Sequence, residues 1–348
     1  MLDTVTVNAS KGSYEVTIGR GLSIGNLLKT VKHECHVCVI SDDTVFSLYG
    51  KKTMDSLEAV GYTVDSFVFP HGETSKNMHT VVDILEFLAE KELTRSDILL
   101  ALGGGVVGDI TGFAASIYLR GIDFVQVPTT LLAAVDSSVG GKTGADLKAG
   151  KNLVGAFHQP IAVFLDVDSF NSLPKEQFAE GMAESIKYGM ILDKDLFETF
   201  EKGDYEIENI CKRCIELKAM IVKEDEFDTG LRQILNFGHT PAHAIEKLSN
   251  FTVSHGFAVG IGMAIMTKVS ERKGLLEKGS YERLEKVLLK NGLLTKTEYS
   301  SKELAMNTLT DKKRKGNDIS LILLEQIGKA KITKVPVTEI EAYYELGY

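Results

Sequence analysis

The sequence lacks a long apolar run, an excess of positive charge and any internal repeat. Its longest uncharged apolar stretch, residues 256–267, is too short for a membrane helix, which needs about 20 residues. The N-terminus also has no apolar signal core. We therefore expect a cytoplasmic protein that binds no membrane. The net charge of −9, from 39 basic and 48 acidic residues, argues against nucleic-acid binding, because phosphate contacts require clustered lysine and arginine.

Cysteine is also scarce, and the four residues form two C-x-x-C pairs, Cys35/Cys38 and Cys211/Cys214. The pairs lie much further apart than the roughly 15–20 residues that separate the pairs of a structural zinc site. The first pair is predicted on a strand, which turns its two side chains to opposite faces. The second is predicted on a helix, where cysteine serves as a small core residue. A shared metal site or redox disulfide is disfavoured, and we assign the pairs no role.

The order of sequence patterns predicts two domains, since 348 residues are too many for one hydrophobic core. A hairpin is expected at 4–8 and 13–18. From there to about residue 172, short β-branched runs alternate with helical patterns, which predicts an α/β, Rossmann-like domain with a parallel sheet over residues 1–172. Ligands of such sheets bind beyond the strand carboxyl ends, where the strand order reverses. Long helical periodicities then predict a mainly α-helical domain over residues 173–348. The candidate metal ligands described below lie in this domain, and the family resemblance given below implies that it also binds substrate.

Glycine is concentrated in one part of the chain, since residues 101–160 hold 11 of the 32 glycines. Gly103, Gly104 and Gly105 directly follow an apolar strand, and a helix is expected to begin near Val107. Bare backbone at a helix N-terminus admits a pyrophosphate, because free N–H groups and the helix dipole attract the anion. The spacing G-G-G-x-x-G-D differs from the G-x-G-x-x-G fingerprint. The segment therefore predicts a dinucleotide site without the ordinary Rossmann motif.

A second glycine cluster, at 140–143 (GGKT), resembles the end of a phosphate-binding P-loop. The full motif requires glycine at position 136, where Asp136 stands, so a Walker-type ATPase is excluded. We expect flexible backbone that carries Lys142, Lys151 and Asn152 toward a small anionic ligand.

One carboxylate and three histidines lie at predicted helix positions in the second half of the chain. Glu184 lies within a helix, His239 and His243 adjoin a helix start with Thr240 as the expected N-cap, and His255 opens another helix. A carboxylate with two or three histidines fits a catalytic Zn²⁺ site with an open position. The spacing leaves open whether His243 or His255 is the third ligand.

The order of these motifs resembles the 3-dehydroquinate synthases, a family of sugar-phosphate cyclases. The similar segments are 103–109 (GGGVVGD), 118–121 (YLRG), 128–132 (PTTLL), 136–143 (DSSVGGKT), 150–157 (GKNLVGAF), 181–187 (GMAESIK), 235–240 (LNFGHT), 255–256 (HG) and 311–313 (DKK). The resemblance implies a carbon–oxygen lyase of the shikimate pathway. It would convert 3-deoxy-arabino-heptulosonate 7-phosphate to 3-dehydroquinate and phosphate, by transient oxidation with NAD, β-elimination, re-reduction and intramolecular aldol closure.

The resemblance also implies the residues of the site. The metal ion, Zn²⁺ or alternatively Co²⁺, would be held by Glu184, His239 and His255. NAD would contact Asp42, Glu73, Lys76, Gly104, Gly105, Asp109, Thr129, Thr130, Lys142, Lys151 and Ser172. The anionic sugar-phosphate substrate would contact Asp136, Lys142, Asn152, Lys187, Lys218, Arg232, Asn236, His243 and one of Lys312 and Lys313. Arg120 would reach the phosphate from the neighbouring subunit of a homodimer.

Three other functions fit parts of this pattern. A related cyclase would act on sedoheptulose 7-phosphate or glucose 6-phosphate, and Arg232, Asn236 and His243 favour the carboxylate-bearing substrate over these. A metal-dependent, glycerol-dehydrogenase-like oxidoreductase acts on neutral polyols and would not need so many cationic residues. A catalytically silent binding protein would not need the metal ligands. Two departures from the family pattern, at Pro241-Ala242 and at Phe257, remove no implied ligand.

Overall fold

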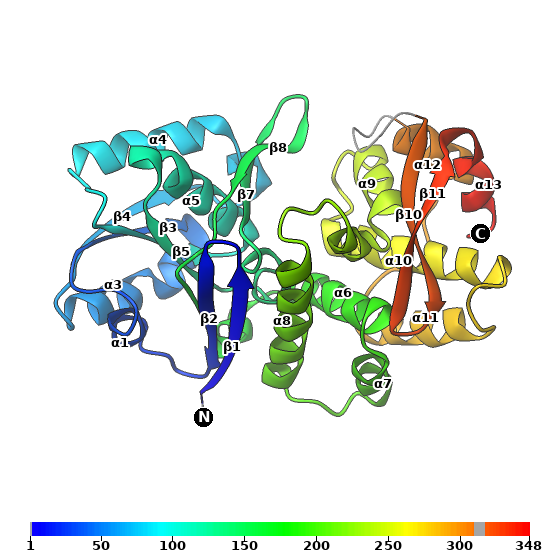
Figure 1. Ribbon diagram of the computed structural model, residues 1–348, viewed down its shortest axis with the longest axis horizontal. Helices are drawn as coiled ribbons and strands as arrows, with labels where there is room; N and C mark the ends of the chain where they lie inside the picture. The colour runs from blue at the N-terminus through cyan, green and yellow to red at the C-terminus, as the bar shows by residue number, and fades with distance from the viewer. Residues whose placement is uncertain (1, 310–316) are drawn as a thin grey trace. The chain divides into compact units, whose positions relative to one another are not determined.

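The computed structural model describes residues 2–309 and 317–348, and the chain forms two compact units (Figure 1). The first comprises Met1–Leu173 and Lys218–Phe227, and the second comprises Pro174–Leu217 and Asp228–Tyr348. No helix in the described ranges is both long and apolar enough to span a membrane.

The first unit is built on a seven-stranded sheet with the order β1-β2-β9-β6-β5-β3-β4. Its strands are β1 (Asp3–Ala9), β2 (Gly12–Gly19), β3 (His36–Asp42), β4 (Thr63–Phe69), β5 (Ile98–Gly103), β6 (Asp123–Pro128) and β9 (Ala162–Asp166). All neighbours pair in parallel except β1 and β2, which form the predicted N-terminal hairpin. The α/β prediction is confirmed, with the correction that β1 makes the sheet mixed. The strand order reverses between β3 and β5, so this is the edge at which a ligand is expected.

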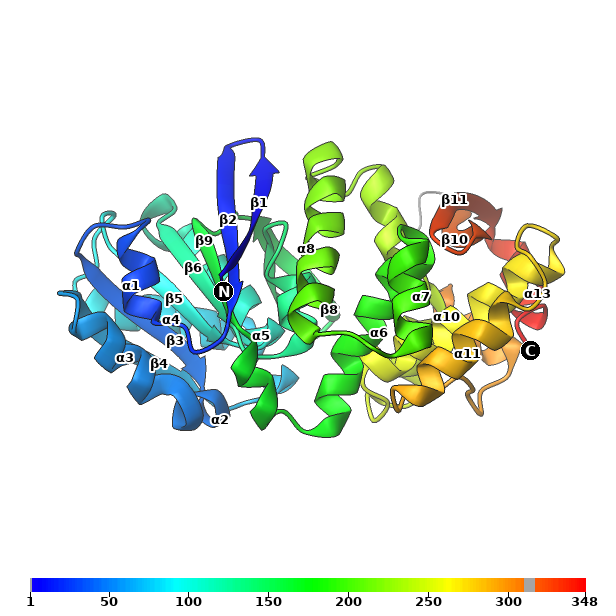
Figure 2. The same ribbon diagram turned by 90° about the horizontal axis from the view of Figure 1, so that it is seen from below.

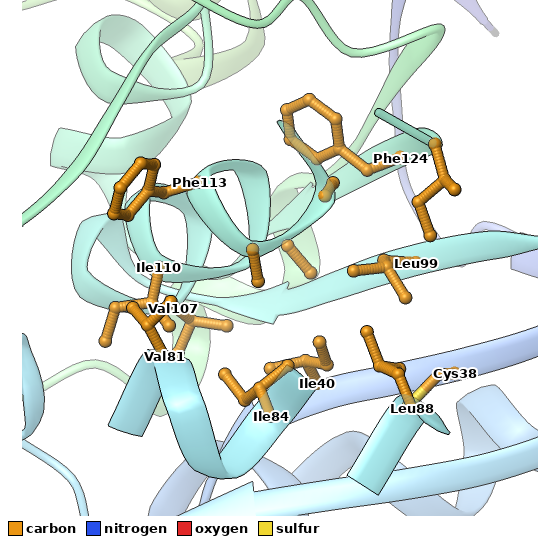
Figure 3. Packing of buried hydrophobic residues seen from close by; sticks show 14 of the residues in the cluster. Cys38, Ile40, Val81, Ile84, Leu88, Leu99, Val107, Ile110, Phe113 and Phe124 are labelled. Carbon is orange, nitrogen blue, oxygen red and sulfur yellow. The ribbon is translucent and has the colours of Figure 1, made fainter. Parts of the chain in front are cut away.

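Helices cover both faces of this sheet (Figure 2). They are α1 (Ile24–Lys29), α2 (Asp43–Val45), α3 (Lys51–Glu58), α4 (Met78–Glu90) and α5 (Gly105–Ile117). Helices α4 and α5 pack on one face, against Cys38 and Ile40 (Figure 3), while α1 and α3 pack on the other, against Val37 and Val39. Cys35 packs with this second cluster, so the predicted opposite orientation of Cys35 and Cys38 is confirmed.

The segment that we expected as flexible backbone around an anionic ligand is instead a β-ribbon. Strands β7 (Lys142–Leu147) and β8 (Gly150–Phe157) pair antiparallel and form a separate two-stranded sheet beside α5 (Figure 1). Thr143, Gly144 and Ala145 of β7 are buried, and Ala145 belongs to the same core cluster as residues of α4 and α5. Consequently Lys142, Lys151 and Asn152 are carried on ordered strands.

The second unit is mainly helical, as predicted. Its elements are α6 (Lys175–Ile191), α7 (Lys194–Lys202), η6 (Leu231–Asn236), α9 (His239–Leu248), α10 (His255–Arg272), α11 (Ser280–Lys290), α12 (Ser301–Thr308), α13 (Ile340–Glu345) and a hairpin of β10 (Asp318–Gln326) and β11 (Lys329–Pro336). Helix α10 is buried along most of its length and packs against α6, α9 and α11. Helix α8 (Ile207–Glu224) contributes residues to both units, and its Cys211 and Cys214 are buried and form no disulfide.

Candidate functional site

One carboxylate and two histidines converge in the second unit. Glu184 lies on α6, while His239 and His255 are the first residues of α9 and α10. One potential ligand atom from each lies within 4.8 Å of the others. Each histidine Nε2 is 3.5 Å from Oε1 of Glu184, whose side chain is fully buried. Three helices thus direct three donor atoms to one point.

Close helix packing explains this convergence. A methyl group added at Gly256 would overlap the Cα of Glu180 on α6, and one added at Gly262 would overlap the main-chain carbonyl oxygen of Gly238. Helix α10 therefore touches both α6 and the start of α9 through bare backbone. The N-cap of α9 is Gly238, with a φ of +78°, and the helix begins at His239. The prediction of Thr240 as the N-cap is therefore wrong.

The second ring nitrogen of each histidine faces an acceptor. Nδ1 of His239 donates to the carbonyl oxygen of Phe237 at 3.1 Å, and Nδ1 of His255 lies 3.5 Å from Oε1 of Glu246. Both rings therefore turn Nε2 toward Glu184. The other carboxylate oxygen of Glu184 forms an ion pair with Lys187, which is also buried.

The electrostatics of the two histidines differ. Burial lowers the pKa of His239 well below its usual value, and nearby Lys187 lowers it further, so the ring is held neutral, as a metal ligand must be. Burial also acts to lower the pKa of His255, but hydrogen bonding to Glu184 and Glu246 outweighs it and raises that pKa to about 10. The carboxylates of Glu184 and Glu246 thus favour a positive charge at His255.

The donor set fits a divalent metal ion. One carboxylate oxygen and two imidazole nitrogens are the ligands that Zn²⁺ and similar ions accept, and three protein ligands leave a position open for substrate. His243 was the alternative third ligand by spacing. Its ring centroid lies 5.9 Å from that of His239 and 6.4 Å from that of His255, beside the cluster and outside the group of converging ligand atoms.

A second cluster of predicted residues lies in the first unit, where β5 leads into α5. Gly104 is the N-cap of α5, and Gly105 is its first residue, two residues before the expected start at Val107. On the next turn, Asp109 forms an ion pair of 2.6 Å with Lys76, whose Nζ also donates to Oδ1 of Asn152 at 2.7 Å.

Both members of this ion pair have shifted pKa values. Burial raises the pKa of Asp109, with Lys76 opposing the shift. Burial acts to lower the pKa of Lys76, but Asp109 and Glu73 reverse this and raise it. Lys76 thus stays positively charged near the start of α5, where an anion would also be attracted by the helix N-terminus.

A third pair in the first unit joins Asp136 to Lys218. The Lys218 ammonium donates to both the main-chain oxygen and the carboxylate of Asp136, and only 5% of Lys218 is exposed. Because Lys218 lies on the part of α8 that belongs to the first unit, tertiary packing brings together two residues that are distant in sequence.

The other residues predicted to contact NAD surround the carboxyl ends of the strands in the first unit. Asp42 ends β3 and accepts a hydrogen bond from the Val45 N–H at 2.9 Å, and Thr130 Oγ1 accepts one from the Ala133 N–H at 3.1 Å. A cavity of about 290 Å³ lies beside Leu102, Val127 and Thr129. The remaining members of this set are Glu73, paired with Lys151 at 3.5 Å, Ser172, whose Oγ lies 2.6 Å from Tyr49 Oη, and Lys142, the first residue of β7.

The remaining predicted residues lie on other elements or outside the described ranges. Arg120 ends η3 (Tyr118–Arg120), beyond the far end of α5 from Gly104, in a turn where Leu119 and Arg120 both have positive φ. In the second unit, η6 carries Arg232, which is 2% exposed, and Asn236, three residues before His239. Lys312 and Lys313 lie outside the described residues.

Sequence reasoning assigned no function to Glu246, Gly256 or Gly262. A signal for Glu246 was present, because it follows His239 by seven residues and so lies on the same face of α9. The two glycines gave no comparable signal, since their closeness to other helices depends on tertiary packing.

Comparisons with known proteins agree over the whole chain. A family model described as 3-dehydroquinate synthase N-terminal matches residues 66–180, and one described as 3-dehydroquinate synthase C-terminal matches residues 181–314. A 3-dehydroquinate synthase of Clostridium kluyveri is 42% identical over an alignment of 352 positions, and the match covers 98% of each chain.

Two solved structures are similar in fold. A 2-deoxy-scyllo-inosose synthase complexed with carbaglucose-6-phosphate, NAD⁺ and Co²⁺ has a TM-score of 0.89 and 26% identity, over 99% of this chain and 100% of the other. The 2-epi-5-epi-valiolone synthase of Streptomyces hygroscopicus subsp. jinggangensis, with NAD⁺ and Zn²⁺ bound, has a TM-score of 0.88 and 25% identity, over 98% of each chain.

Proposed function

The chain belongs to the 3-dehydroquinate synthase family, and from this premise we propose how its residues serve the reaction. Its activity is that of a phosphate-eliminating lyase of the shikimate pathway. The observation that carries our assignment of the site is the convergence of Glu184, His239 and His255 on one point.

We propose that these three side chains hold a divalent ion, Zn²⁺ or alternatively Co²⁺. When bound, the ion would act as a Lewis acid on a substrate oxygen. Glu184 contributes the negative charge, while its pairing with Lys187 keeps an ammonium group beside the open position. His243 lies next to both histidines of the cluster and is suited to move a proton at the substrate. Support comes from the similar cyclases, which were solved with Co²⁺ or Zn²⁺.

We propose that NAD binds at the carboxyl edge of the sheet in the first unit. When bound, it would accept a hydride from a substrate alcohol and return it within one turnover. Gly104 and Gly105 leave the N-terminus of α5 open to the pyrophosphate. The other contacts in this proposal are Asp42, Glu73, Lys76, Asp109, Thr129, Thr130, Lys142, Lys151 and Ser172. The similar cyclases were solved with NAD⁺.

The proposed substrate is 3-deoxy-arabino-heptulosonate 7-phosphate, which carries a carboxylate and a phosphate. Cationic side chains are what such an anion requires, and buried ones bind it more strongly because water does not screen them. Lys187, Lys218 and Arg232 are each no more than 5% exposed. The remaining proposed contacts are Asp136, Lys142, Asn152, Asn236 and His243.

We also propose a homodimer in which Arg120 serves the site of the neighbouring subunit. Helix α5 has 13 residues and is about 20 Å long, so Arg120 lies far from the Gly104 end of its own unit. Ile117 and Leu119 are 42% and 38% exposed beside it, which suits an interface. Mixing Arg120→Ala with His255→Ala protein should restore activity that neither has alone. Mixed dimers without activity would contradict this role.

We propose a cytoplasmic location, because none of the four cysteines, all within the described residues, is in a disulfide, as is usual in a reducing compartment.

One assay tests the activity and the choice of substrate. The protein incubated with the heptulosonate phosphate, catalytic NAD⁺ and Zn²⁺ should release one phosphate per substrate without net NADH. Release from sedoheptulose 7-phosphate alone would point to a related cyclase, and NADH accumulation with glycerol would point to a dehydrogenase.

His255→Ala should lose bound metal and about a thousandfold in kcat/KM, because several kcal/mol of charge stabilisation would be removed. A His255→Ala protein with full metal content and full activity would refute the ligand assignment.

A further inference from the structure

The two histidines of the cluster differ in what supports them from behind. His239 is held by a main-chain carbonyl, that of Phe237, whereas His255 faces the carboxylate of Glu246. A carbonyl is neutral and set by the backbone, while a carboxylate is charged and depends on one side chain. Glu246 is itself 5% exposed, although carboxylates are almost never fully buried without a partner.

His255 needs such support more than His239 does. Its side chain is 34% exposed, compared with 11% for His239, so packing restricts its ring less. It also follows the turn between α9 and α10, in which Asn250 and Phe251 have positive φ. That turn is tied to Glu246, because the Phe251 N–H donates to the Glu246 carbonyl oxygen at 2.7 Å.

We propose that Glu246 is a positioning residue for the metal site, orienting His255 by accepting from its Nδ1 so that Nε2 faces the ion. The proposal rests on the assignment of Glu184, His239 and His255 as ligands, and it adds a group that does not touch the metal. A carboxylate behind a ligating imidazole selects the tautomer with a lone pair on Nε2 and makes that nitrogen a stronger donor.

The charges around the site support this role. Glu184 is the one carboxylate among the three ligands, and one of its oxygens pairs with Lys187. A divalent ion with two neutral imidazoles would therefore leave excess positive charge in a buried place. Glu246 supplies a second negative charge through His255, so the cost of burying the ion decreases.

The test measures Co²⁺ affinity by competition with a chelator, and the visible spectrum of the bound Co²⁺. Glu246→Ala should weaken Co²⁺ binding by about 100-fold and alter the spectrum, because His255 loses its orientation. Glu246→Gln should weaken binding by about tenfold, because the amide oxygen still accepts from Nδ1 but the charge is lost. The Co²⁺ affinity of Glu246→Asp should fall between those of the wild type and Glu246→Ala.

Asp193→Asn is the matched control for a buried carboxylate of the same unit. Asp193 accepts from the Leu196 N–H at 3.1 Å and pairs with Arg213 at 2.5 Å, outside the cluster. Its loss should reduce thermal stability and leave Co²⁺ affinity unchanged. Glu246→Gln protein that is folded, with wild-type affinity and spectrum, would overturn the positioning role.

The ligand assignment has a separate readout. If His255→Ala binds Co²⁺ as tightly as wild type, the proposed metal site fails, and the role of Glu246 fails with it. If His255→Ala loses Co²⁺ while both Glu246→Ala and Glu246→Gln retain it, only the positioning role fails.

Discussion

A methyl group added at Gly104 or Gly105 in the first unit would meet the side chains of Thr130 and Ser137 at 3.2 Å and 3.1 Å. In the second unit, a methyl group added at Gly256 would overlap the backbone of α6, and one added at Gly262 would overlap the N-cap of α9. The first two glycines lie at a helix N-terminus beside movable side chains. The other two lie within a packed core, where the neighbouring atoms cannot move away.

These four glycines therefore do different physical work at the two candidate sites. Gly104 and Gly105 leave N–H groups accessible to a ligand, and little in the protein itself depends on their missing side chains. Gly256 and Gly262 let α10 touch α6 and the start of α9, and the distances among Glu184, His239 and His255 depend on those contacts. Alanine at Gly104 should therefore weaken ligand binding more than it lowers stability, whereas alanine at Gly256 or Gly262 should lower the stability of the protein.

Gly262→Ala should have the largest effect. The new methyl group would overlap the Gly238 carbonyl oxygen, so α10 must move away from the residue before His239. We expect a loss of about 3 kcal/mol or more in the free energy of unfolding, at the upper end for overpacking, together with loss of bound metal. Denaturant unfolding and metal analysis of the purified protein measure the two effects. Wild-type stability would contradict a close contact between Gly262 and the Gly238 carbonyl oxygen.

Gly256→Ala should have a smaller effect on stability and a clear effect on metal binding. Gly256 follows His255 directly, and its contact with Glu180 lies one helical turn from Glu184. We expect about 2 kcal/mol of destabilisation and at least a tenfold weaker Co²⁺ affinity. An unchanged Co²⁺ affinity in a destabilised protein would show that the ligands adjust independently of this contact.

Gly104→Ala is the matched substitution in the first unit and should have the smallest effect on stability. Gly104 has φ of −76°, which alanine adopts without strain, and the nearest atom is a side-chain methyl group of Thr130. We expect a change of less than about 1 kcal/mol in stability but about a tenfold weaker affinity for NAD, because the methyl group would occupy the approach to the helix N-terminus. Calorimetric titration with NAD⁺ checks this. An unchanged affinity for NAD⁺ would show that Gly104 does not keep the helix N-terminus open to the ligand.

Local patterns in the sequence predicted most of the secondary structure. The apolar run at residues 162–166 predicts a strand and forms β9, and the helical periodicity at residues 280–290 predicts a helix and forms α11. Errors occurred where a local pattern was weak. The β7–β8 ribbon was missed because glycines interrupt its alternation, and α12 was missed although Ser300 and Glu303 form a capping box at its start.

The site was predictable to different degrees in the two units. Strand, glycines and helix are contiguous, so the sequence by itself indicated an anion site at Gly104 and Gly105. In the second unit, spacing left His243 and His255 as alternatives. The family resemblance implied His255, and in the structure His255 lies with Glu184 and His239 while His243 lies beside them.

The sequence by itself determined the alternation of strands and helices, the glycine-rich helix start and the identity of the chemical groups, because each depends on residues that are neighbours along the chain. Only the tertiary structure decided that Lys218 pairs with Asp136, that Glu246 stands behind His255, and that α10 touches α6 closely enough to bring His255 to Glu184. Those contacts join residues on different elements, and their geometry follows from how whole helices and sheets pack.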